Sequence, residues 1–278
     1  VEIDRFPIGQ DEGLGHVIEE LQLNDNEELD TDFVLSKSNI LDLNNKNLIE
    51  PKKIEKRERI DLTDKNSYLF KSWNSDNSPT LPMIQLEHGK NGSTKLWLHT
   101  NNLAERVDLN NKKTLEIFFK CFESLPLLNN WHNYLSEAIR NASKFNLDEK
   151  NEAISLCLNL NSDNEIVEWS FHLTLVKCAL VVGSDHIDAL LSRKSKTRIT
   201  SRLLKPIKEH IDDLDKILEI SNSFRKKHLL SGKVEIPKPV NKITELDEFF
   251  IHNPAECSKG YFEPLKKEDC QTYLSPLL

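Results

Sequence analysis

The sequence predicts an α+β protein, because strand-like and helix-like apolar patterns alternate along its 278 residues. Segments 81–100 and 153–182 alternate apolar and polar residues around short turns, as hairpin strands do. Segments 111–124 and 201–231 carry apolar residues along one helical face. A chain of this length can also bury a full core.

The chain opens with short alternating pieces, VEIDRFPIGQDEGLGHVIEEL, which Gly9, Gly13 and Gly15 interrupt. This pattern predicts β-structure of the kind found at the end of a small barrel. Residues 41–65 are polar and charged, and PKKIEKRER is typical of an exposed connection. We therefore expect a barrel-like segment over 1–40, a linker over 41–65 and a larger domain over 66–278.

The clearest hairpin has an apolar strand from Leu81 to Leu86, a Gly-Lys-Asn-Gly-Ser turn and a second strand from Lys95 to Thr100. A helix should follow over 111–124 and end before Pro126. Its apolar face, which predicts core packing, contains Leu115, Phe118, Phe119 and Phe122.

The second hairpin is predicted from ISLCLNL, the turn SDNE and IVEWSFHLTLV. A helix should then begin near Ser184 or Asp185. A longer helix is predicted over 201–231, with Pro206 in its first turn and Gly232 as its terminator. Its apolar side consists of Leu203, Leu204, Ile207, Ile211, Leu214, Ile217, Leu218 and Phe224.

Composition excludes several classes of function. A net charge of −8 and a pI of about 5.7 do not fit a generally basic nucleic-acid binder, so RNA binding would need local positive patches. The five cysteines are widely spaced, which favours a reducing cytoplasm over a zinc site. No apolar run is long enough to span a membrane, and no P-loop, G-x-S-x-G or G-x-G-x-x-G motif is present.

Four stretches, in this order, resemble the ribonuclease II / ribonuclease R family of 3′→5′ exoribonucleases. VEIDRFPIGQDEGLGHVIEEL resembles the end of the family's second cold-shock barrel, and RERIDLT the step before its RNB catalytic domain. KLWLHTNNLAERV resembles the strand usually written L-x-V-H-I-A-D-V. The fourth stretch that resembles the family is AISLCLNLNSDNEIVEWSFHLTLVKCALVVGSDHIDALL. The resemblance implies the tail of an OB-type barrel followed by a truncated RNB-like domain.

The family holds Mg²⁺ with aspartates in the pattern D, five residues, then D-x-D-D before an apolar strand. Aligned on Met83 to Leu86, those positions hold Trp73, Pro79, Leu81 and Pro82 in this chain. In the next strand, where the family has Ala-Asp, this chain has Asn101-Asn102. His99 stands where the family has its histidine. Mg²⁺ needs hard oxygen ligands, so we expect no metal cofactor and no catalytic residue at these positions.

Candidate RNA contacts come from a run at 192–208 that has seven basic residues and no acid. Its leading members are Arg193, Lys194, Lys196, Arg198 and Arg202, and the alternative interpretation is a solvated loop and helix start. Trp97 and His99 are further candidates, because aromatic rings stack on bases. For Trp97, packing in the core or at its edge is the favoured interpretation.

Three functions stay open. The first is a non-catalytic relative of the exoribonucleases that binds single-stranded RNA or another protein. The second is an active Mg²⁺-dependent exoribonuclease, and the third is a protein-interaction module without RNA binding, which the net negative charge favours. We expect a cytoplasmic bacterial protein, and the sequence does not determine its oligomeric state.

Overall fold

The computed structural model describes residues 2–7, 12–17, 50–71, 80–89, 92–120, 124–127, 130–133, 135–193, 201–234, 274 and 276–277. The chain divides into two compact units. The first contains residues 1–51 and 107–140, and the second contains residues 52–106 and 141–278. Residues 52–65, expected to be a linker, therefore belong to the second unit.

The first unit contains short elements only. Strands β1 (Glu2–Arg5) and β2 (Leu14–His16) form an antiparallel pair, as the N-terminal alternation predicts. Helix α3 (Lys112–Lys120) is followed by the strand pair β7 (Leu125–Leu127) and β8 (Asn130–His132). The core prediction for this helix is wrong at Phe119, whose side chain is 81% exposed.

The second unit is built on one six-stranded sheet in the order β3-β10-β4-β5-β6-β9. Its strands are β3 (Ile60–Asp61), β4 (Ser67–Lys71), β5 (Thr80–His88), β6 (Thr94–Asn101), β9 (Lys150–Leu160) and β10 (Ile166–Val182). Both predicted hairpins, β5–β6 and β9–β10, are antiparallel pairs in the structure. In the second turn Asn164 has a positive φ of 55°, a conformation that asparagine tolerates.

Strand β10 closes the sheet into a ring. Its residues 166–177 pair with β9, and its residues 178–182 pair in parallel with β4. Strands β4, β5, β6, β9 and β10 are therefore linked in a closed circle. Closure satisfies backbone groups that an open sheet would leave at its edges.

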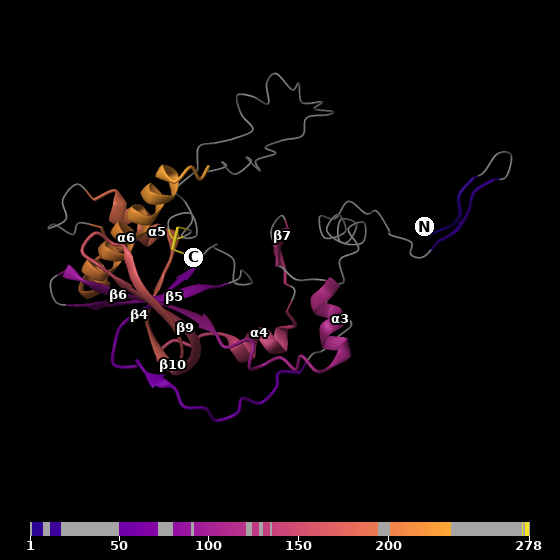
Figure 1. The fold of residues 1–278 in the computed structure, drawn as a ribbon, viewed down its shortest axis with the longest axis horizontal. Helices are drawn as coiled ribbons and strands as arrows, with labels where there is room; N and C mark the ends of the chain where they lie inside the picture. The colour runs from indigo at the N-terminus through magenta and orange to yellow at the C-terminus, as the bar shows by residue number, and fades with distance from the viewer. Residues whose placement is uncertain are drawn as a thin grey trace, which may run out of the picture. The chain divides into compact units, whose positions relative to one another are not determined.

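Helices α5 (Ser184–Leu191) and α6 (Ile211–Leu230) pack against this sheet (Figure 1). The start of α5 was predicted correctly, and Gly232 follows α6 with a φ of +88°. The long helix begins ten residues later than predicted, after the 3-10 turn Lys208–His210. Pro206 lacks an N–H and lies in the turn region before it, although Leu204 and Ile207 are still buried.

Two hydrophobic clusters contain side chains from this sheet. The large cluster lies between sheet and helices; it includes Tyr68, Phe70, Ile84, Leu86, Leu96, Leu98, Leu158, Ile187, Leu204, Leu214 and Ile217. The small cluster consists of Leu62, Leu69, Met83, Trp97, Phe145, Ala153, Cys157, Val176 and Cys178. Cys157 and Cys178 are buried free thiols, and burial raises the pKa of both.

Candidate functional site

The start of β5 is the place where the family resemblance puts the metal ligands. Between Thr80 and Met83 the strand advances three residues while its partner β4 advances two, from Lys71 to Leu69. The extra residue is a β-bulge, a feature that re-aims side chains and accommodates proline. Pro82 lies in this irregular stretch.

The bulge directs Leu81 toward the helices. Strand alternation would put Leu81 on the face of Met83, which belongs to the small cluster. Instead Leu81 packs against the large cluster, and both it and Pro82 are half-buried. Trp73 and Pro79, the other two positions, lie outside the described residues. The two described positions thus offer carbon rather than oxygen to a cation.

The nearest acid on β5, Glu87, has other partners. Glu87 accepts hydrogen bonds from Trp97 Nε1 at 2.7 Å and from Lys65 Nζ at 2.6 Å. Burial raises the pKa of Glu87, but these hydrogen bonds and lysine charges lower it overall. Within the described part of the chain, no three His, Cys, Asp or Glu side chains are grouped so that they could hold a metal ion.

Trp97 and His99, two candidate RNA contacts, are both buried. Trp97 is 6% exposed and His99 is not exposed at all. His99 Nδ1 lies 2.7 Å from Ser155 Oγ, which in turn lies 2.6 Å from Thr174 Oγ1. Burial lowers the pKa of His99 to about 3, so the ring is neutral at physiological pH. We do not propose that either side chain touches RNA directly.

The described members of the basic run at 192–208 differ in burial and in their partners. Arg193 Nη2 donates to both carboxylate oxygens of Asp215, at 2.7 and 2.5 Å, and its side chain is 6% exposed. Arg202, Lys205 and Lys208 are exposed. Lys194, Lys196 and Arg198 lie outside the described residues. Among the described members of the run, Arg193 is therefore neutralised and the other three face solvent.

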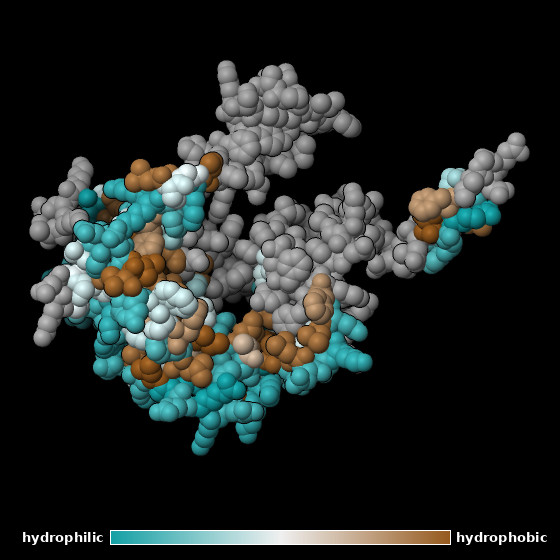
Figure 2. Space-filling model, viewed as in Figure 1, coloured by the Kyte–Doolittle hydropathy of each residue, from teal (hydrophilic) through white to brown (hydrophobic). Residues whose placement is uncertain are grey.

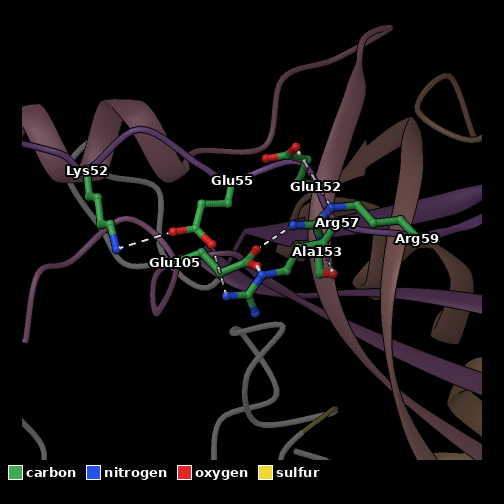
Figure 3. Close-up of polar contacts among 7 residues, drawn as sticks. All are labelled: Lys52, Glu55, Arg57, Arg59, Glu105, Glu152 and Ala153. Atoms are coloured by element: carbon green, nitrogen blue, oxygen red, sulfur yellow. Dashed lines mark hydrogen bonds and ion pairs between the residues drawn. The ribbon is translucent and has the colours of Figure 1, made fainter.

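A chain of ion pairs joins the segment before β3 to the loop after β6 and the start of β9 (Figure 3). Arg59, whose side chain is 4% exposed, pairs with Glu105 and lies 3.8 Å from Glu152. Its Nη1 also donates to the Ala153 carbonyl at 3.4 Å, and Arg57 reaches Glu105 at 3.3 Å. Burial raises the pKa of Glu105, but hydrogen bonding and the arginine charges hold it below its usual value. The network thus holds charged groups in a partly buried position.

A cavity of about 460 Å³ lies beside this network. Its lining combines the buried side chains of Asn102 and Phe145 with the exposed side chains of Lys144 and Lys150. Asn102 follows β6 and is 2% exposed, and its Oδ1 has no hydrogen-bond partner within the described residues. Other lining residues are Ile54, Arg106, Ala142, Ser143, Asn146, Asn151, Glu152 and Leu175.

Sequence reasoning missed this cavity. The residues come from four separated stretches, and only the closed sheet brings them together. Asn102 was noted as a replacement for an aspartate, but its burial was not foreseen. The polar segment FNLDEKN, which leads into β9, did indicate a turn, because Asn and Asp favour turns. Asp148 in this segment has a φ of +61°.

A closed ring of strands with helices packed against it defines a mixed α and β domain. The family model for the RNB domain matches residues 59–260, and the chain belongs to the RNB-domain family. No curated protein sequence matches it.

Solved structures agree on the fold. Mycoplasma genitalium RNase R in complex with double-stranded RNA superposes with a TM-score of 0.71 at 16% identity, over 99% of this chain and 47% of that one. Yeast Ssd1, described as a pseudonuclease, gives a TM-score of 0.65 at 17% identity, over 82% of this chain and 28% of that one. Candida glabrata Dss1, an exoribonuclease active-site mutant, gives a TM-score of 0.57 at 15% identity, over 80% of this chain and 29% of that one. This chain therefore spans less than half the length of these relatives.

Proposed function

We propose that the chain is a non-catalytic member of the RNB-domain family that binds RNA. The observation that carries this proposal is the position of Leu81. The family resemblance puts a metal-ligating aspartate there, whereas Leu81 packs against the large cluster between sheet and helices. A divalent cation needs several oxygen ligands, and desolvating it beside an aliphatic side chain is unfavourable.

Two further observations support the loss of catalysis. Pro82, the other described position that the resemblance aligns with a metal ligand, has no side-chain oxygen. It lies in a bulge that constrains the backbone there. Yeast Ssd1, a pseudonuclease, has the same fold. A family member without catalysis therefore has a precedent on this scaffold.

The RNA-binding part rests on the exposed cations after α5. Arg202, Lys205 and Lys208 are exposed and have no acid among them in the sequence up to Glu209. Exposed cations in one stretch attract phosphates without needing a catalytic metal. Structures of Mycoplasma genitalium RNase R with single-stranded and double-stranded RNA use the same fold.

The first experiment incubates the protein with 5′-labelled single-stranded RNA in Mg²⁺ or Mn²⁺. We expect no shortening, because Leu81 and Pro82 cannot hold the ion. A Leu81→Ala variant is the matched control for contamination, since a co-purifying nuclease would act equally in both preparations. Metal-dependent shortening that survives purification and differs between the two proteins would establish the active exoribonuclease instead.

The second experiment measures RNA affinity against salt concentration. Binding through phosphates should weaken with salt, with a slope of log K of about −0.7 per contact in single strands. Arg202→Glu with Lys205→Glu should reduce that slope by about 1.4, because two contacts are lost. Lys226→Glu, an exposed site on α6, should leave the slope unchanged. No binding at any salt concentration would remove RNA from the proposal.

A specific observation favours a protein partner as the second candidate. Val167, Trp169 and Phe171 point to one face of β10 and are 71%, 62% and 65% exposed. The Trp169 and Phe171 rings lie 5.7 Å apart, edge to face. Apolar patches lie among the polar surface over β9 and β10 in Figure 2. Neighbouring exposed aromatics are typical of protein-binding surfaces.

Analytical ultracentrifugation and crosslinking in cell extract test this candidate. The wild type and a Trp169→Ser, Phe171→Ser variant are compared. A crosslinked species that disappears in the variant, together with absent RNA binding, would favour the protein-interaction module. Unchanged crosslinking would remove this patch as the docking surface.

A further inference from the structure

We propose that the chain forms a symmetric dimer in which β10 of one copy pairs edge to edge with β10 of a second copy. The surface concerned is residues 167–173 of β10, which include the exposed Val167, Trp169 and Phe171. The proposal gives the exposed apolar patch on β10 one occupant, another copy of this chain. It depends neither on RNA binding nor on the loss of catalysis.

One edge of this part of β10 has no partner strand among the described residues. Strand β9 pairs with one side of β10 from residue 166 to residue 177. On the other side, β3 begins at the level of Thr174 and β4 at the level of Cys178. The edge that faces away from β9 can therefore accept a further strand along residues 167–173.

The open edge presents the backbone groups of alternate residues. The Leu175 carbonyl accepts a hydrogen bond from the Leu62 amide at 2.9 Å, on the side of β10 away from β9. In a strand, the N–H and C=O groups of every second residue point to the same edge. Trp169 and Phe171 lie on the same alternation as Leu175. The residues with exposed aromatic rings therefore also offer backbone donors and acceptors to a neighbouring strand.

This edge lacks the residues that usually protect an edge strand. Lysine and proline on an edge strand hinder its pairing with another chain. Residues 167–173 contain neither, and Glu168 is their one acid. The bulge in the pairing with β9 lies between Ile166 and Glu168, so the strand is regular from Glu168 onward. Nothing in this stretch of sequence therefore opposes the addition of a strand.

The sequence of the edge is also complementary to itself. In an antiparallel pairing centred on Ser170, Trp169 lies opposite Phe171 of the second copy, and Glu168 lies opposite His172 of the second copy. The first pair joins two aromatic rings, and the second sets a carboxylate against an imidazole. A pairing centred on Glu168 would set two carboxylates against each other. Because a symmetric interface contains each contact twice, this complementarity favours a second copy as the occupant.

The expected contact is small, so the dimer should be weak. Trp169 and Phe171 are 62% and 65% exposed. An aromatic side chain buries about 150–250 Å² when it is fully covered. These side chains from both copies, with a short strand pairing, bury less than the roughly 1,200 Å² at which stable interfaces begin. We therefore expect a dissociation constant in the micromolar range.

Sedimentation velocity of the purified chain without RNA, from about 1 to about 200 µM, tests the proposal. We expect the weight-average sedimentation coefficient to rise with concentration toward that of a dimer. Trp169→Ser with Phe171→Ser should weaken the dimer at least about tenfold, because it removes the aromatic pairs. Leu230→Ser is the matched control, since this apolar side chain on α6 is 88% exposed but lies off the edge. Thermal unfolding of each variant checks that the fold is retained.

A cysteine at Ser170 tests the register. In the proposed pairing the two Ser170 residues face each other as a non-hydrogen-bonded pair, with Cα atoms about 4.5 Å apart, which a disulfide can span. Mild oxidation of Ser170→Cys should give a covalent dimer, and mass spectrometry should find the two substituted positions linked to each other. Glu165→Cys, in the exposed turn before β10, is the matched control and should form no such link.

Three results would overturn the proposal. A sedimentation coefficient that does not change with concentration would leave the patch to a different protein. A dimer that persists in Trp169→Ser with Phe171→Ser would lie on another surface. Equal crosslinking at positions 165 and 170 would mean that the copies collide without a fixed register. Since RNA and metal are absent from these measurements, their failure is distinguishable from a failure of the proposed function.

Discussion

The start of β5 and the start of β9 belong to the same sheet but differ in chemistry. At the start of β5, Leu81 and Pro82 are half-buried, and Leu81 packs against the large cluster. At the start of β9, Lys150, Asn151 and Glu152 are held by ion pairs and loop hydrogen bonds. The polar groups that the family resemblance places at β5 are absent there, while polar groups gather two strands away.

The difference shows that the sheet forms with apolar side chains at Leu81 and Pro82. Strand β5 pairs with β4 on one side and with β6 on the other, antiparallel in both cases, with one bulge in the pairing with β4. The closed ring and the helices supply the remaining stability, and these depend on apolar side chains rather than on carboxylates. The fold therefore does not by itself establish that the family's chemistry is present.

The largest expected effect is at Arg59, and it tests whether the β9 region contributes to stability. Arg59→Met removes the main partner of Glu105, whose side chain is 11% exposed, and leaves a buried carboxylate. We expect a loss of about 3 to 5 kcal/mol in the free energy of unfolding, measured with urea. Since the loss comes from the uncompensated charge, Arg59→Met with Glu105→Leu should recover part of it.

Arg57 provides the matched control for that measurement. It contacts the same Glu105, but its side chain is 53% exposed. Arg57→Met should therefore cost less than about 1 kcal/mol, because exposed ion pairs are screened by solvent. Equal losses for Arg57→Met and Arg59→Met would contradict the buried network.

The next effect concerns the start of β5. Leu81→Asp puts a carboxyl group against the large cluster and should lower the free energy of unfolding by about 2 to 4 kcal/mol. If no ion site forms, millimolar Mg²⁺ should not raise the thermal midpoint of Leu81→Asp with Pro82→Asp more than that of the wild type. A selective rise with Mg²⁺ would mean that a metal site can be rebuilt there.

Much of the second unit could be predicted from the sequence, because its patterns are local. Both hairpins and the start of α5 follow from alternation and turn residues. The start of α6 was misplaced, because the apolar period continues through Leu204 and Ile207 although the backbone there is not helical. Phe119 was misplaced because periodicity does not reveal which face of a short helix is covered.

The candidate site was less accessible to sequence reasoning. The resemblance placed Leu81 and Pro82 at aspartate positions of the family, but it did not reveal the bulge that turns Leu81 toward the helices. Trp97 and His99 could not be assigned to solvent or core, because both faces of β6 are covered in a closed ring. The cavity depends on long-range pairing, which no local pattern encodes.

A pH-dependent effect comes from His99, which lies on β6 between β5 and β9. Burial lowers its pKa to about 3, whereas the unfolded state titrates near 6.5. Below pH 6.5 the unfolded chain binds a proton that the folded chain does not, so stability falls with pH from 6.5 toward 3. His99→Gln should remove up to about 1.4 kcal/mol per pH unit of this slope. Parallel pH profiles for both proteins would contradict a buried neutral ring.

The smallest effect extends the comparison to β10, the partner of β9. Trp169 is 62% exposed, so Trp169→Ser should change the free energy of unfolding by no more than about 0.5 kcal/mol. Trp97, on β6, is 6% exposed, and Trp97→Ser should cost about 3 kcal/mol or more because it leaves a cavity. Urea unfolding of both variants makes the measurement. A large loss at Trp169 would mean that this tryptophan stabilises the fold, and the argument for a partner surface on β10 would lose its main support.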